Sequence, residues 1–135
     1  MEPVKLLALD LDGTLLNSKK ELTPRTRAAL YAAAEAGVEI VPTTGRFFGA
    51  MPEAIRTLPF LHYAITVNGA QVYDIRRDCA VSRAELPLEK TLRIMEYLDG
   101  FPVIYDCYMD NWGWITRSMQ SRAADYITNP HSLYM

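Results

Sequence analysis

Residues 4–14 read VKLLALDLDGT, and this stretch decides the fold. Val4 to Leu9 is almost continuously apolar, which is typical of a strand buried on both faces of a parallel sheet. Asp10 and Asp12 follow at once, together with a glycine. Ligands of open α/β sheets bind just beyond the carboxyl ends of the strands. The stretch therefore predicts a buried strand that ends at a candidate binding site.

Further along the chain, strand-like and helix-like segments alternate with short connections. Thr23 offers an N-cap, Pro24 suits the first helical position and Gly37 supplies a stop. The expected elements after the first strand are a helix at Pro24–Ala36, a strand at Val38–Val41, a helix at Phe47–Leu58 and a strand at Ala64–Val67. This βαβαβ order predicts an α/β fold with a Rossmann-like parallel sheet as its core.

The rhythm changes after Asp74 and predicts a second, α+β unit. Its expected elements are a strand near Ala80–Ala84, a helix at Leu88–Leu98, strands at Val103–Tyr108 and Trp112–Thr116, and a helix at Met119–Ile127. We therefore expect the chain to divide into residues 1–75 and 76–135. The 135 residues suffice for one compact domain and are short for two complete ones.

Composition excludes several classes of function. The formal charge of −2 comes from 14 basic and 16 acidic residues that are mixed along the chain. No basic face for nucleic acid or a membrane surface is evident, so small molecules are the expected partners. Cys79 and Cys107 lack metal-site spacing and are expected to be reduced thiols. The apolar N-terminal run is too short for a signal or membrane segment, which favours a cytoplasmic protein.

Polar residues follow each of the first three predicted strands. The segments are Asp10–Thr14, Thr43–Arg46 and Asn68-Gly69. Because the carboxyl ends of parallel strands meet at one edge of a sheet, these segments are the candidate site.

The aspartate pair indicates phosphoryl transfer assisted by a metal ion. Two carboxylates in one crevice need a compensating cation, and Mg²⁺ prefers oxygen ligands. Asp10 could attack a phosphate to form a phospho-aspartate, while Asp12 protonates the leaving oxygen and later activates water. Gly13 permits the turn that brings backbone N–H groups toward a phosphate.

Each motif also has a structural interpretation. Thr44-Gly45-Arg46 could be an N-cap and tight bend, although its N–H groups suit a phosphate and Arg46 could reach substrate oxygens. Asn68-Gly69 is a common hairpin turn, with Val67 and residues 71–73 as its arms. The aromatic cluster Tyr105, Tyr108, Trp112 and Trp114 favours packing in a core over lining a pocket. His62 and His131 are isolated, and neither is expected to act as a base or metal ligand.

Three runs resemble the N-terminal pattern of the haloacid dehalogenase superfamily, and within it the Cof-type sugar-phosphate phosphatases. They are LLALDLDGTLLNSKKELTPRTRAAL, VPTTGRFF and AITVNGAQVYD, which match in order and spacing over the first predicted unit. The resemblance implies a phosphoric monoester hydrolase whose residues after Asn68-Gly69 begin a mobile cap over the substrate.

The resemblance also implies roles for individual residues. Asp10 would be the nucleophile, Asp12 the general acid and base, and Mg²⁺ would be held by the Asp10 carboxylate and the Asp12 backbone carbonyl. Thr44 would hold the transferring phosphoryl group. The other implied phosphate or substrate contacts are Leu11, Asp12, Gly45, Arg46 and Asn68.

Relatives of this kind also use a later lysine and a later acidic pair, and neither is identifiable here. Lys90, the only lysine beyond Lys20, lies on a predicted helix outside the core. We therefore expect a truncated phosphatase with little activity alone. The alternatives are a non-catalytic phosphate- or metal-binding module, or an oligomerising unit whose open strand edge at Val4–Leu9 pairs with another chain.

Overall fold

The computed structural model describes residues 2–123. The chain divides into two compact units, Met1–Arg83 and Ala84–Met135, which are described separately. The first unit contains β1 (Leu6–Asp10), α1 (Pro24–Glu35), β2 (Glu39–Thr43), the 3₁₀ turn η1 (Phe48–Ala50), α2 (Glu53–Arg56), β3 (Tyr63–Thr66), η2 (Val67–Gly69), β4 (Gln71–Asp74) and β5 (Cys79–Arg83). The second contains α3 (Leu88–Leu98), β6 (Cys107–Met109), β7 (Trp112–Trp114), η3 (Arg117–Met119) and α4 (Gln120–Ala123).

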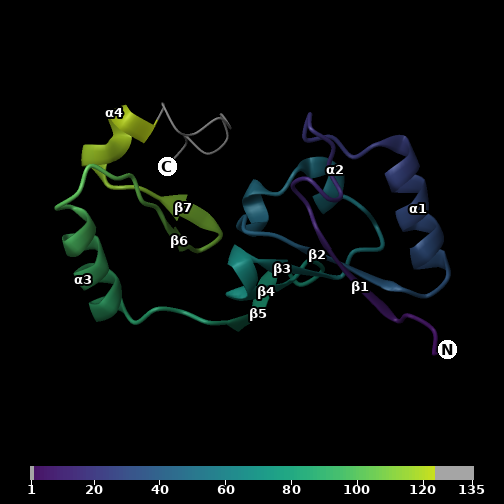
Figure 1. The fold of residues 1–135 in the computed structure, drawn as a ribbon. Coiled ribbons are helices and arrows are strands. Elements are labelled where there is room, and N and C mark those ends of the chain that lie inside the picture. Colours follow the sequence, from purple (N-terminus) through teal and green to yellow (C-terminus); the bar gives the residue numbers. More distant parts are fainter. Residues whose placement is uncertain (1, 124–135) are drawn as a thin grey trace. The chain divides into compact units, whose positions relative to one another are not determined.

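A mixed sheet forms the centre of the first unit (Figure 1). Its order is β1-β2-β3-β4-β5, with β1, β2 and β3 parallel and the later pairs antiparallel. The predicted Rossmann-like order of strand, helix and strand is confirmed for the parallel part. The consequence for the site is that β1, β2 and β3 all end at the same edge of the sheet.

Helix α1 begins and ends where its sequence signals predict. The Thr23 side chain accepts a hydrogen bond from the Thr26 N–H at 3.2 Å, which satisfies one of the free donors of the first turn. Beyond the last turn, the Gly37 and Val38 N–H groups donate to carbonyls of the helix. Leu30 is the buried residue that anchors the helix in the core.

The prediction of one long helix at Phe47–Leu58 is wrong. The structure has the 3₁₀ turn η1 and then the single-turn helix α2. Met51 precedes Pro52, and its backbone is extended, with φ −69° and ψ 141°. A proline disfavours the helical conformation of the residue before it, so Pro52 separates the two turns.

The expected burial of β1 on both faces is also wrong. Its residues alternate between exposed and half-buried, and Leu6 is 56% exposed. Leu7 and Leu9 pack against the core, and among residues 2–123 only β2 pairs with this strand. The core itself is formed by Leu11, Leu15, Leu16, Leu30, Ile40, Met51, Ile55, Leu58, Leu61 and Ala64.

The predicted strand near Ala80–Ala84 forms as β5, but it belongs to the first unit. β5 pairs with β4, which extends the core sheet beyond the division expected after residue 75. The Asn68-Gly69 turn connects β3 to β4, as a hairpin should, but Val67 lies in the turn and not in the strand. The antiparallel extension therefore follows from this turn.

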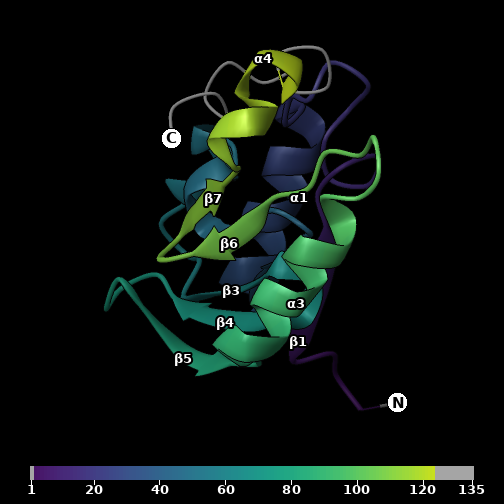
Figure 2. The same ribbon diagram turned by 90° about the vertical axis from the view of Figure 1, so that its left-hand side faces the viewer.

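The second unit contains a helix beside a short hairpin (Figure 2). Helix α3 has the predicted bounds, and β6 pairs with β7 in antiparallel register. The Cys107 thiol of β6 lies 4.0 Å from the Met95 sulfur of α3. Part of the predicted helix at Met119–Ile127 forms as η3 and α4, and its remainder, like His131, lies outside the described residues.

The aromatic residues of this hairpin do not form the expected core. Within the described part of the unit, Tyr108, Trp112 and Trp114 are all exposed. They lie on short strands of a two-stranded sheet, which has few neighbours to cover them. Throughout residues 2–123, no helix has the length and apolar character needed to cross a membrane.

Leu11→Ala is expected to lower the free energy of unfolding by about 2–5 kcal/mol, because Leu11 is fully buried among core leucines. Urea unfolding followed by circular dichroism measures this change. Leu86→Ala is the matched control, since the same truncation at a residue that is 64% exposed and lies outside β1 should cost under about 1 kcal/mol. Equal losses for the two variants would contradict the assigned core.

Candidate active site

The parallel pairing of β1 with β2 places the first two predicted site segments side by side. In this register Asp10 lies opposite Thr43, so the loop after β1 adjoins the loop after β2. An open hollow of about 340 Å³ lies at this edge. Its lining residues are Ala8, Asp10, Thr43, Thr44, Gly45 and Asn68.

Backbone hydrogen bonds lock the loop after β2 to the loop after β3. The Thr44 N–H donates to the Ile65 carbonyl at 2.9 Å, and the Asn68 N–H donates to the Thr44 carbonyl at 3.1 Å. The Val67 N–H donates to the Arg46 carbonyl at 3.0 Å. The two loops therefore form one rigid wall of the hollow.

Asn68 and Gly45 meet closely in this wall. Val67 and Asn68 both have left-handed backbone conformations, with φ 52° and 53°. Such a conformation is unfavourable for a β-branched valine and persists only where surrounding contacts enforce it. A Cβ atom on Gly45 would lie 2.8 Å from the Asn68 Oδ1 atom. A side chain at position 45 would therefore displace the Asn68 amide from its place in the hollow.

Thr44 and Asp10 present different groups to the hollow. Thr44 is buried, and its hydroxyl oxygen accepts a hydrogen bond from the Arg46 N–H at 3.2 Å. The hydroxyl hydrogen can still be donated to a ligand. Asp10 is exposed, and its carboxylate accepts a hydrogen bond from the Thr14 hydroxyl at 3.4 Å. An acceptor-only carboxylate thus lies beside a hydroxyl that can donate.

Main-chain contacts close the loop after β1. The Leu15 N–H donates to the Asp10 carbonyl at 3.2 Å, and the Leu16 N–H donates to the Leu11 carbonyl at 2.9 Å. Gly13 has φ 82° at the turn. The Leu11 side chain is fully buried, so only its backbone could contact a ligand.

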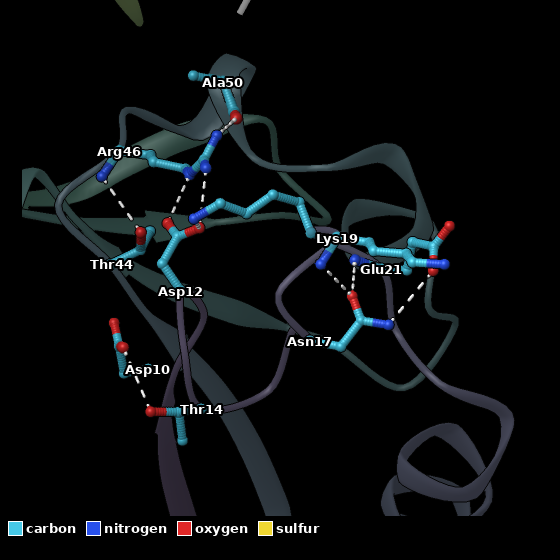
Figure 3. Close-up of polar contacts among 10 residues, drawn as sticks. Asp10, Asp12, Thr14, Asn17, Lys19, Glu21, Thr44, Arg46 and Ala50 are labelled. Carbon is cyan, nitrogen blue, oxygen red and sulfur yellow. Dashed lines mark hydrogen bonds and ion pairs between the residues drawn. The ribbon is translucent and has the colours of Figure 1, made fainter. Parts of the chain in front are cut away.

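The Asp12 carboxylate turns away from Asp10 and binds two cations (Figure 3). The Arg46 Nε donates to Asp12 Oδ2 at 2.9 Å, and the Arg46 Nη2 donates to Oδ1 at 3.0 Å. The Lys20 Nζ donates to the same Oδ1 atom at 2.8 Å. Arg46 is further fixed by donation from Nη1 to the Ala50 carbonyl at 3.2 Å.

These contacts set the protonation of Asp12. Hydrogen bonds from Arg46 and then Lys20 lower the pKa of Asp12 from 3.8 to about 2. The same contact with Asp12 raises the pKa of Arg46. A carboxyl group whose pKa is lowered by folding stabilises the folded state at pH values above its ordinary pKa. The contribution of Asp12 is therefore present above pH 3.8 and is lost as the pH falls through about 2. In this arrangement Asp12 is a carboxylate at neutral pH.

The structure thus brings together some of the predicted site residues and separates others. Asp10, Thr44, Gly45 and Asn68 share the hollow. Asp12 and Arg46 lie beside it, bound to each other. Thr14 was predicted to lie in a candidate segment but had no assigned role, and Lys20 was not among the predicted site residues, although these two residues contact the two aspartates. The position of Thr14, four residues after Asp10, could have indicated its contact with that residue. For Lys20, nothing in the sequence beyond its charge indicated the contact with Asp12.

The oxygen donors at the end of β1 suit Mg²⁺ in kind. The Asp10 carboxylate and the backbone carbonyl of Asp12 are hard ligands of the type that this ion prefers. Residues 2–123 contain no group of three or more His, Cys, Asp or Glu side chains that could hold a metal ion. The described part of the chain therefore offers oxygen ligands of the kind that Mg²⁺ prefers, but only a few of them.

Comparison with known proteins gives consistent matches. Residues 7–133 match the model of the haloacid dehalogenase-like hydrolase family. The chain is similar to the pyridoxal phosphate phosphatase YbhA of Escherichia coli, with 35% identity over 107 residues, which is 79% of this chain and 39% of that protein. It is also similar to the 5-amino-6-(5-phospho-D-ribitylamino)uracil phosphatase YcsE of Bacillus subtilis, with 37% identity over 53% of this chain and 28% of that protein.

A solved structure shows the same arrangement of elements. A haloacid dehalogenase-like hydrolase from B. subtilis aligns with a TM-score of 0.74 and 25% identity, covering 96% of this chain and 48% of that one. The chain therefore spans less than half the length of these relatives.

Arg46→Met is expected to raise the pKa of Asp12 from about 2 toward 3.8, because it removes the largest of the interactions that lower it. Carbon-13 NMR of the Asp12 carboxyl group during a pH titration measures the midpoint. Arg56→Met is the matched control, since Arg56 donates to the Met51 carbonyl and not to Asp12. An unchanged midpoint in Arg46→Met would show that the pair does not form in solution.

Proposed function

Because this chain belongs to the haloacid dehalogenase-like hydrolase family, we propose that it supplies the nucleophile and phosphate-binding loops of a phosphatase that requires Mg²⁺. The substrates would be small phosphorylated metabolites such as sugar phosphates. The observation that carries the proposal is the single hollow shared by Asp10, Thr44 and Asn68. A carboxylate, a hydroxyl donor and an amide donor at one strand edge suit attack on a bound phosphate.

The chemistry would proceed in two displacements. An oxygen of Asp10 attacks phosphorus, the ester P–O bond breaks, and the leaving oxygen takes a proton. Water then attacks the phospho-aspartate and releases inorganic phosphate, restoring the Asp10 carboxylate. The Thr44 hydroxyl and the backbone N–H groups nearby would hold the phosphoryl oxygens through both steps.

Mg²⁺ would be held by the Asp10 carboxylate and the Asp12 carbonyl. When bound, the ion neutralises the repulsion between an anionic nucleophile and an anionic phosphate. Further ligands and a cation near the phosphate would come from segments that correspond to the part of its relatives that this chain does not span. For this reason we propose little or no turnover by these 135 residues alone.

Asp12 is proposed as the proton donor and acceptor for the two steps. Its carboxylate is bound by Arg46 and Lys20 beside the hollow, where its pKa is about 2. A general acid works best with a pKa near the operating pH. The role therefore requires Arg46 to release Asp12, because this removes the largest of the interactions that lower the pKa of Asp12. We also propose a cytoplasmic location, in agreement with the two free cysteines.

Asp10→Asn is expected to abolish phosphatase turnover in the complete gene product, with a loss of at least about a thousandfold, because an amide cannot act as the nucleophile. Release of phosphate from an aryl phosphate, with and without Mg²⁺, measures the effect. Asp110→Asn, an exposed carboxyl in the turn before β7, is the matched control and should retain activity. Turnover by Asp10→Asn at the wild-type rate would refute the covalent mechanism.

The edge of β1 favours a second property, association with another chain. Among residues 2–123, β1 pairs only with β2, and Leu6 in the strand and Val4 just before it are exposed. Unpaired backbone groups beside apolar side chains attract another strand. We propose a homo-oligomer in which a second copy covers this edge.

Leu6→Lys is expected to shift the 135-residue chain from oligomer to monomer, because a charge on an edge strand opposes pairing with a second copy. Size-exclusion chromatography with light scattering measures the mass. Leu92→Lys places the same charge on an exposed residue of α3 and should leave the oligomer intact. A monomeric wild-type chain would refute the association.

A further inference from the structure

The turn from residue 17 to residue 21 is built by the side chain of Asn17 (Figure 3). Its Oδ1 atom accepts hydrogen bonds from the Lys19 and Glu21 N–H groups, both at 2.9 Å. Its Nδ2 atom donates to Glu21 Oε2 at 3.2 Å, and its own N–H donates to the Glu21 carbonyl at 3.0 Å. The turn is therefore closed from both ends, without help from the Lys20 side chain.

Lys20 occupies an unfavourable backbone conformation in this turn. Its φ is 63°, in the left-handed region that glycine or asparagine adopts more easily. Its N–H donates to the Asn17 carbonyl at 2.9 Å, so the turn enforces that conformation. Strain of this kind on an exposed lysine suggests that the side chain has a task. Within residues 2–123, the polar contact of the Lys20 side chain is its ion pair with Asp12 at 2.8 Å.

Lys20 and Arg46 reach Asp12 from different loops and share one oxygen. Both donate to Oδ1, while Arg46 alone donates to Oδ2. The three groups carry one net positive charge, since two cations meet one carboxylate. The carboxylate therefore keeps a cationic partner even if one of the two leaves.

Of the two cations, Arg46 is the better placed to leave for a ligand. It follows directly on Thr44 and Gly45, which line the hollow, and its planar fork suits phosphate oxygens. Lys20 lies on the turn after β1, which contributes no lining residue, and its side chain is 60% exposed. An anion in the hollow would thus compete with Asp12 for Arg46 and not for Lys20.

We infer that Lys20 is a positioning residue, which holds the Asp12 carboxylate when an anion in the hollow takes over Arg46. The inference rests on the proposed function, because it requires a phosphate in the hollow. It assigns separate tasks to the two cations. Arg46 would contact the anion directly, whereas Lys20 would act only through Asp12.

A double-mutant cycle on the 135-residue chain tests this division. The probe is inorganic phosphate at a fixed Mg²⁺ concentration, and the dissociation constant comes from NMR shifts of the Thr44, Gly45 and Asn68 amides. Lys20→Met should raise the dissociation constant about fivefold or more, because Asp12 then retains Arg46 more strongly. Lys19→Met, a neutralised lysine in the same turn, should change it less than about twofold.

The Asp12→Asn background separates the two tasks. There, Lys20→Met should have no further effect, while Arg46→Met should still weaken phosphate binding. Lys20→Arg should restore binding in the otherwise wild-type chain, since it returns a cation to Asp12. Amide spectra of each variant establish that the fold is intact, and Lys20→Gln serves as a second neutral variant.

The opposing outcomes are distinct. An equal loss from Lys20→Met in both backgrounds would overturn the inference, because Lys20 would then act without Asp12. An equal loss from Lys19→Met would also overturn it, because a general charge effect would suffice. A wild-type chain in which phosphate leaves the hollow amides unshifted would refute the proposed phosphate site, and the role of Lys20 with it.

Discussion

The parallel ladder between β1 and β2 is the constraint on which the site depends. It runs from Leu6 opposite Glu39 to Asp10 opposite Thr43, so both strands end at the same level. A shift of one residue would turn the Asp10 side chain to the other face of the sheet, because side chains alternate along a strand. Leu7 and Leu9 pack in the core and oppose such a shift. The packing of these two half-buried leucines against the core thus places a carboxylate beside Thr44.

Charge is distributed unevenly around this edge. Asp10 lies exposed in the hollow, whereas Asp12 is paired with Arg46 and Lys20. Partly exposed ion pairs contribute little to stability, so the cluster is better understood through the position that it gives to Asp12. Two cations on one carboxylate keep that group charged and fixed beside the hollow. The cluster also keeps Arg46 close to the place where a phosphate would bind.

The sequence predicted those features that depend on local chemistry. Helix α1 has its cap at Thr23 and ends before Gly37, and both signals lie within the segment itself. The prediction of one helix after Phe47 was wrong because Pro52 disfavours a helical backbone at Met51, although the periodicity of the segment is helical. The prediction that β1 is buried was wrong because an apolar run does not reveal whether both faces and both edges of a strand are covered.

The same distinction between local signals and distant contacts applies to the candidate site. The placement of Asp10, Thr44 and Asn68 at one edge follows from strand order, which the alternation of elements reveals. The pairing of Asp12 with Arg46 joins residues 34 positions apart and depends on side-chain conformations. Lys20 reaches Asp12 only because Asn17 closes a turn with a left-handed residue. No periodicity in the sequence reports such a contact.

The strand that carries Asp10 is also an edge strand within residues 2–123. Its position is therefore fixed by hydrogen bonds on one side only, and edge elements open more readily than central ones. Any opening of β1 would move Asp10 relative to Thr44, which β2 and β3 hold firmly. Misplacement of a reacting group by a small distance lowers the rate of reaction strongly. A strand on the free edge of β1 would thus stabilise the fold and fix the nucleophile at the same time.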